Sequence, residues 1–194
     1  MTALRKEKKY TPEQYLALEE EAGCKSEYVN GSVFKMAGGT EAHITISFNL
    51  TRLFADKLRG KCRAYQSDMK VWVEEAGTFF YPDVTLVCGE RKFYRNRRDI
   101  VENPILLVEV LSESTKEYDK NDKFLTYQQI ESFQEYVLVS QNQPAVQQFI
   151  RQADGSWKYK ATIGLNSEVC FESVESKMSL QEIYDLVEFE EENL

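Results

Sequence analysis

Two nearly continuous apolar stretches, 79–87 and 105–111, stand out in the pattern of hydrophobic and polar positions along the chain. Stretches without polar alternation are typical of strands covered on both faces, so we expect both at the centre of a sheet. Each stretch contains one acidic residue, Asp83 in the first and Glu109 in the second. An unpaired charge buried among apolar side chains is costly even after the protein relaxes around it. The two carboxylates therefore require a shared cation.

Three longer helices are predicted from capping signals and helical spacing. Thr11 as N-cap, Pro12 at the first helical position and Gln14 as its capping-box partner predict a helix over 12–21. The second is expected over 41–58 and the third over 119–130. The side chains expected to face the core are Ile44, Phe48, Leu53 and Phe54 in the second helix, and Phe124 and Tyr127 in the third.

Strands account for most of the remaining pattern. The pair Asn30-Gly31 tolerates the positive φ angles of a tight turn and predicts a hairpin over 27–36. Further strands are expected at 62–66, 69–73, 135–140, 145–150 and 157–163, and a capping box at Ser179 predicts a short terminal helix. No repeat or linker divides the chain, so we predict one domain over 1–194, with a charged tail at 1–9 and an acidic tail at 188–194.

The composition limits location and partners. No apolar run approaches the roughly 20 residues of a membrane span, and the N-terminus lacks the apolar segment of a secretory signal. We therefore expect a cytoplasmic protein. The cysteines are scattered without a C-x-x-C pair, so we expect free buried thiols with no function at Cys24, Cys62, Cys88 and Cys170.

The charge of the chain argues against tight non-specific binding of nucleic acid. The net charge is -8, whereas that affinity comes largely from Lys and Arg neutralising phosphates. One loop is locally basic and has aromatic residues between its cations, which are Arg91, Lys92, Arg95, Arg97 and Arg98. We consider two interpretations of equal weight. In one, this loop makes weak contact with nucleic acid, and in the other it is an ordinary solvated surface loop.

Three short motifs resemble a known family. Pro82-Asp83, Glu109-Val110-Leu111 and the spacing Asp119-xxx-Lys123-xxx-Tyr127 are similar to those of the Uma family of restriction endonucleases, within the PD-(D/E)XK nuclease superfamily. The likeness extends from Tyr10 to Tyr184. It implies an α/β restriction-endonuclease-like fold, with a central mixed β-sheet flanked by helices and an added β-rich portion. It also implies a Mg²⁺- or Mn²⁺-dependent endonuclease that hydrolyses DNA as a homodimer.

One position departs from the superfamily pattern. The third motif position, where the superfamily has Lys, is Leu111 here. The resemblance therefore implies a catalytic Lys from elsewhere, with Lys123 as the candidate and Lys116 in reserve. The alternative is that Lys123 merely pairs with Asp119, four residues earlier on the same helix face.

The resemblance assigns the remaining site residues. Asp83 and Glu109 would bind the metal, with the Val110 carbonyl as a further ligand and Asp68 at a second, weaker metal site. Glu27 would join the acidic cluster, and His43 would contact phosphate or relay a proton. From the residues alone, the favoured interpretation is that Glu27 and Asp68 are solvated strand residues and that His43 is an ordinary polar residue near a helix start.

Two other functions remain open. The acidic charge and the missing third-position Lys fit an interaction module that keeps the fold without efficient cleavage. The same carboxylates would also serve a small-molecule metallohydrolase.

Overall fold

A six-stranded mixed sheet forms the centre of the molecule in the computed structural model, which describes residues 9–112 and 116–189. Its strand order is β11-β10-β9-β8-β6-β3, and only the β8/β9 pair is parallel. The strands are β3 (Cys62–Gln66), β6 (Val84–Cys88), β8 (Leu106–Leu111), β9 (Glu135–Ser140), β10 (Ala145–Arg151) and β11 (Trp157–Ile163). The central position predicted for the stretch containing Glu109 is confirmed, because β8 lies between β6 and β9 and its first five residues are buried.

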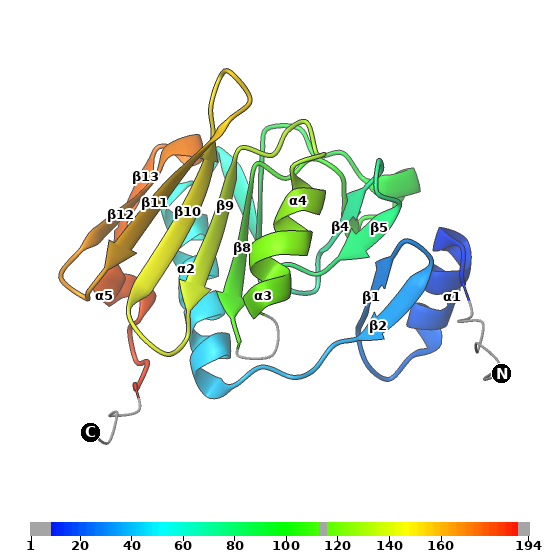
Figure 1. Cartoon of the computed structure of the whole chain (residues 1–194), viewed down its shortest axis with the longest axis horizontal. Coiled ribbons are helices and arrows are strands. Elements are labelled where there is room, and N and C mark those ends of the chain that lie inside the picture. The colour runs from blue at the N-terminus through cyan, green and yellow to red at the C-terminus, as the bar shows by residue number, and fades with distance from the viewer. Residues whose placement is uncertain (1–8, 113–115, 190–194) are drawn as a thin grey trace, which may run out of the picture.

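A second, five-stranded sheet stands beside the first, on the right in Figure 1. Its order is β2-β1-β5-β4-β7, and it contains the predicted hairpin, whose turn residues Asn30 and Gly31 both have positive φ. The strands are β1 (Ser26–Val29), β2 (Ser32–Lys35), β4 (Lys70–Val73), β5 (Thr78–Phe80) and β7 (Ile100–Val101). Helix α1 (Pro12–Glu21), with the predicted capping box, packs on this sheet through Tyr15 and Leu16.

Helices cover both faces of the central sheet (Figure 1). Helix α2 (Glu41–Lys57) lies on one face, and the β12–β13 hairpin and α5 pack in the same core. On the other face a short helix crosses β8 and β9. It consists of α3 (Lys116–Tyr118), a π-helical turn (Asp119–Lys123) and α4 (Phe124–Tyr127). The remaining elements are β12 (Glu168–Phe171), β13 (Ser176–Ser179), α5 (Leu180–Ile183) and short 3₁₀ turns at Tyr94–Asn96 and Glu172–Val174. The mixed α/β architecture expected from the sequence is thus present.

The apolar stretch at 79–87 is two strands rather than the predicted one. It supplies β5 to the five-stranded sheet and β6 to the central sheet, with Tyr81, Pro82 and Asp83 between them. Pro82 has no N–H to donate to a strand partner, which favours a break at this point. The break leaves Asp83 where the two sheets meet.

The apolar face predicted for α2 was partly wrong. Leu53 and Phe54 are buried as expected, with Ile46 and Leu50 beside them, whereas Ile44 and Phe48 are exposed. Helical spacing alone cannot separate these sets, because the helix carries more apolar residues than one face requires. The tertiary packing decides which of them reach the sheet.

The prediction of free buried thiols is wrong for Cys62 and Cys88, whereas Cys24 and Cys170 are free as predicted but not fully buried. Cys62 and Cys88 lie directly opposite each other on the antiparallel strands β3 and β6 and form a disulfide. Cys24 is exposed and Cys170 is partly buried. The 26-residue separation of the bonded pair gave no local signal, because the pairing follows from strand register.

The predicted tails fall mostly outside the described residues, at 1–8 and 190–194. Within the described part, Lys9 donates to the Asn30 carbonyl and Phe189 packs 5.5 Å from the Tyr184 ring. In the same part of the chain, no helix is long and apolar enough to span a bilayer.

Candidate active site

Glu109 is the central buried carboxylate of the site. It lies on β8 with almost no exposed surface, and its Oε1 accepts hydrogen bonds from Lys123 Nζ at 3.2 Å and from the Tyr127 hydroxyl at 3.0 Å. Burial raises the pKa of Glu109 well above its ordinary value, although the charge of Lys123 opposes this. A carboxylate in this position is stable only because a cation lies next to it.

Lys123 supplies that cation to three carboxylates together. Its Nζ lies 3.0 Å from Glu27 Oε1, 3.2 Å from Glu109 Oε1 and 3.4 Å from Asp119 Oδ1. Only 5% of the residue is exposed. Burial alone would lower the pKa of Lys123, but the attraction of Glu109, Glu27 and Asp119 outweighs it and raises the pKa. Lys123 is therefore a charged group within the site, and its pairing with Asp119 belongs to the same cluster rather than to an exposed helix face.

The π-helical turn at Asp119–Lys123 brings Lys123 into this position. The sequence predicted an ordinary helix from residue 119, whereas the helical segment begins at Lys116 and contains this wider turn. Such turns insert an extra residue into a helix and are frequent at functional sites. Both Asp119 and Lys123 are buried as a result, and the Tyr136 hydroxyl donates to the Asp119 carbonyl at 2.9 Å.

Asp83 is joined to β8 and to helix α2. Its Oδ2 accepts the Val110 N–H at 2.7 Å, and its Oδ1 lies 2.9 Å from His43 Nε2. Burial lowers the pKa of His43, but the hydrogen bond and the charge of Asp83 outweigh it, so the pKa of His43 is raised. Thr40 caps α2 by accepting the His43 N–H, which fixes the first turn of the helix. The Val110 bond sets Asp83 beside the residue that follows Glu109.

Glu27 links the five-stranded sheet to the site. Its Oε1 accepts the Tyr81 N–H at 3.3 Å and contacts Lys123. Because β1 holds Glu27 and β8 holds Glu109, Lys123 bridges the two sheets. The sequence-predicted residues Asp83, Glu109, Lys123, Glu27 and His43 are therefore brought together.

Asp68 lies apart from these contacts. The Asp68 side chain is 86% exposed and pairs with Lys25 at 2.5 Å, where it has no described contact with Asp83 or Glu109. Lys116 begins α3, seven positions before Lys123. Of the two candidate lysines, the structure places Lys123 against Glu109.

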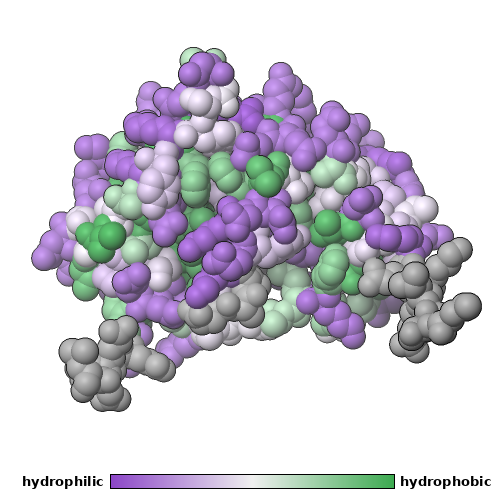
Figure 2. Space-filling view, viewed as in Figure 1, coloured by the Kyte–Doolittle hydropathy of each residue, from purple (hydrophilic) through white to green (hydrophobic). Residues whose placement is uncertain are grey.

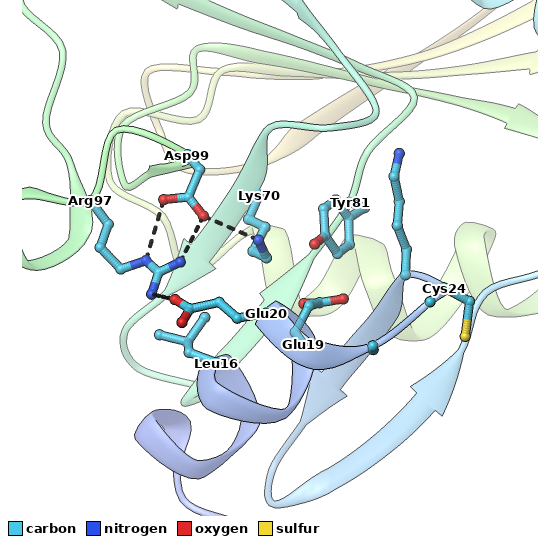
Figure 3. A pocket seen from close by; sticks show the side chains of 11 residues that line it. Leu16, Glu19, Glu20, Cys24, Lys70, Tyr81, Arg97 and Asp99 are labelled. Atoms are coloured by element: carbon cyan, nitrogen blue, oxygen red, sulfur yellow. Dashed lines mark hydrogen bonds and ion pairs between the residues drawn. The ribbon is translucent and has the colours of Figure 1, made fainter.

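The basic loop is anchored to α1 by ion pairs. Arg95 contacts Glu13 at 2.5 Å, and Arg97 contacts both Glu20 and Asp99. The latter contacts lie on the wall of a pocket of about 340 Å³, seen from close by in Figure 3, where Asp99 also pairs with Lys70. These cations are already neutralised by the protein itself. Contact of the other cations, Arg91, Lys92 and Arg98, with nucleic acid stays a prediction.

Two contributors were missed by sequence reasoning. Tyr127 was expected in the core, and it is buried there, but its hydroxyl also holds Glu109. Asp119 was considered only as a partner for Lys123, whereas it is the third carboxylate around the ammonium. The motif spacing contains both residues, but it does not show that the Tyr127 hydroxyl reaches Glu109 or that Asp119 shares the Lys123 ammonium with two other carboxylates.

A hard divalent cation suits the chemistry of the carboxylates, since oxygen ligands are what Mg²⁺ and Mn²⁺ prefer. Asp83 accepts the N–H of Val110, the residue that follows Glu109 on β8. Among the described residues, however, no group of three or more His, Cys, Asp or Glu is arranged to hold a metal ion. The chain thus offers two carboxylates, those of Asp83 and Glu109, both with protein partners that an incoming cation would have to share.

Comparison with known proteins identifies the relatives of the chain. The model of the Uma2 family, described as "Putative restriction endonuclease", matches residues 12–180. Two uncharacterised proteins of Synechocystis sp. are 37% identical over 162 residues (83% of this chain and 92% of the relative) and 36% identical over 150 residues (77% and 78%). The crystal structure of "a putative nuclease belonging to DUF820" from Anabaena variabilis superposes with a TM-score of 0.73 at 16% identity, covering 90% of this chain and 97% of that one. This last likeness shows the fold.

Proposed function

The chain belongs to the Uma2 family, described as restriction endonucleases, and we propose that it is a metal-dependent endonuclease that hydrolyses phosphodiester bonds in DNA. The family and the nuclease-fold neighbour support a nuclease-like function. The observation that carries the proposal is the buried Lys123 ammonium 3.2 Å from Glu109, with Asp83 bound to the adjacent Val110 N–H. In this proposal, Asp83, Glu109 and Lys123 would serve as the two acids and one Lys of the superfamily motif, with the Lys on a different element.

Asp83 and Glu109 would hold Mg²⁺ or Mn²⁺, with the Val110 carbonyl as a further proposed ligand. When bound, such an ion stabilises negative charge on phosphoryl oxygens and favours deprotonation of water. Tyr127 fixes Glu109 Oε1 by its hydrogen bond, which keeps the carboxylate oriented.

Lys123 and His43 are the two side chains of the site that would donate hydrogen bonds to a substrate. Lys123 holds its proton firmly because three carboxylates surround it, so it acts as a hydrogen-bond donor and positive charge rather than as a base. His43 holds a proton at Nε2 against Asp83 and is placed to contact a phosphate or relay a proton. Glu27 positions Lys123 from the opposite side.

Mn²⁺-dependent thermal shifts test the metal site. Ligand binding to the folded state raises the melting temperature by mass action, so Mn²⁺ should stabilise the wild type, while Asp83→Asn and Glu109→Gln should reduce that shift. Asp68→Asn is the matched control, because it removes an exposed carboxylate outside the cluster. Equal Mn²⁺ shifts in the wild type and in the Asp83 and Glu109 variants would show that the metal site is elsewhere.

Cleavage assays separate the enzyme from its alternatives. The proposal requires that the wild type cut plasmid DNA only when Mg²⁺ or Mn²⁺ is present. One observation favours the non-enzymatic interaction module instead: Glu109 and Asp83, the proposed metal ligands, are already paired with Lys123 and His43. Binding of DNA without cleavage under any metal would establish that alternative, and hydrolysis of small phosphoesters alone would establish a metallohydrolase.

Assembly and location are further parts of the proposal. We propose a homodimer in which each subunit cuts one strand, by analogy with nucleases of this superfamily, and a cytoplasmic location. Analytical ultracentrifugation at micromolar concentrations tests the dimer. A monomer at every concentration would contradict this part of the proposal.

A further inference from the structure

Phe34 exposes an aromatic ring beside the candidate active site. It lies directly opposite Glu27 in the β1/β2 pair, and opposed residues of antiparallel strands point to the same face with Cβ atoms about 5 Å apart. Glu27 is buried against Lys123, whereas Phe34 is 56% exposed. A large apolar side chain thus borders the acidic cluster with little protein covering it.

Tyr118 adds a second aromatic ring near the same carboxylates. It lies on α3, partly buried, with its ring centre 6.0 Å from Lys123 Nζ. Figure 2 shows hydrophobic side chains at the surface between the α3–α4 helix and the β1–β2 hairpin. Two aromatic rings, those of Phe34 and Tyr118, therefore lie near the acidic site.

We propose that the DNA acted on at this site is single-stranded or locally unpaired, and that Phe34 stacks against one of its bases. Every base has a flat face available when unpaired, and stacking on aromatic side chains is a general means of holding single strands. Tyr118 is the second aromatic contact. The proposal rests on the proposed nuclease function for its substrate, but it is tested by binding.

Fluorescence anisotropy with a labelled oligonucleotide, alone and annealed to its complement, tests the inference in Ca²⁺ buffer at fixed salt. The wild type should bind the single strand more tightly than the duplex. Phe34→Ala should weaken binding of the single strand by roughly 5- to 150-fold, the loss expected for one stacked base. Phe34→Trp should retain binding, because a larger aromatic ring still stacks.

Tyr159→Ala is the matched control. Tyr159 is also an aromatic residue, 56% exposed, but it lies on the edge strand β11 away from Glu27 and Lys123. Equal affinity for single strand and duplex, equal effects of Phe34→Ala and Tyr159→Ala, or no binding of either oligonucleotide would overturn the inference. A cleavage assay on the same samples keeps the two proposals distinct. Cleavage of both DNA forms without Phe34 dependence refutes only the substrate preference, whereas Phe34-dependent binding without cleavage refutes only the nuclease.

Discussion

Replacing Lys123 with Met tests the electrostatic structure of the site, because it removes the charge and keeps most of the side-chain volume. The substitution leaves Glu27, Glu109 and Asp119 without the ammonium that lies 3.0–3.4 Å from their oxygens. Breaking a buried ion pair by removing one partner costs about 3–5 kcal/mol, because the remaining charge is left unpaired. We therefore expect Lys123→Met to lower the free energy of unfolding by that amount at pH 7, in addition to abolishing cleavage.

Urea unfolding followed by circular dichroism measures this cost. Lys158→Met is the control, because Lys158 pairs with Glu172 at a similar 2.8 Å but on an exposed surface, where ion pairs contribute about 0–1 kcal/mol. Adding Glu109→Gln to Lys123→Met should recover part of the loss, since one of the unpaired charges is then absent. Equal midpoints for Lys123→Met and Lys158→Met would refute the view that Lys123 is a buried structural cation.

Three other predictions follow from the fold. Reduction of the Cys62–Cys88 disulfide, or replacement of both cysteines by serine, should lower the free energy of unfolding by about 3 kcal/mol, because a cross-link between residues 26 positions apart restricts the unfolded chain. Equal urea midpoints with and without reductant would contradict this. Leu107→Ala on β8 should cost about 2–5 kcal/mol through lost burial and a cavity, whereas Leu186→Ala at an exposed position should cost little in the same urea titration. The pKa of His43 is raised, so its contact with Asp83 stabilises the fold fully below pH 6.5, and this stabilisation is lost as the pH rises through the folded-state pKa. The difference in free energy of unfolding between wild type and His43→Gln should therefore shrink as the pH rises over that range. A difference that grows with pH would refute the assignment.

The sequence by itself determined most of the elements and the identity of the key acids. Capping chemistry located α1 and α5 through Thr11 and Ser179, and the Asn30-Gly31 pair located the hairpin. These signals are local, so no knowledge of distant residues is needed to interpret them. Asp83 and Glu109 were conspicuous because a charge in an apolar stretch is unfavourable without compensation.

The tertiary structure decided how those acids are neutralised and what surrounds them. The separation of 79–87 into strands of two sheets, the π-helical turn that buries Lys123, and the register that bonds Cys62 to Cys88 depend on contacts between distant segments. The same is true of Ile44, which helical spacing placed in the core and packing leaves exposed. Periodicity records which residues are apolar, but it does not record how much apolar surface the facing sheet can cover. That limit is set only when the whole chain has packed.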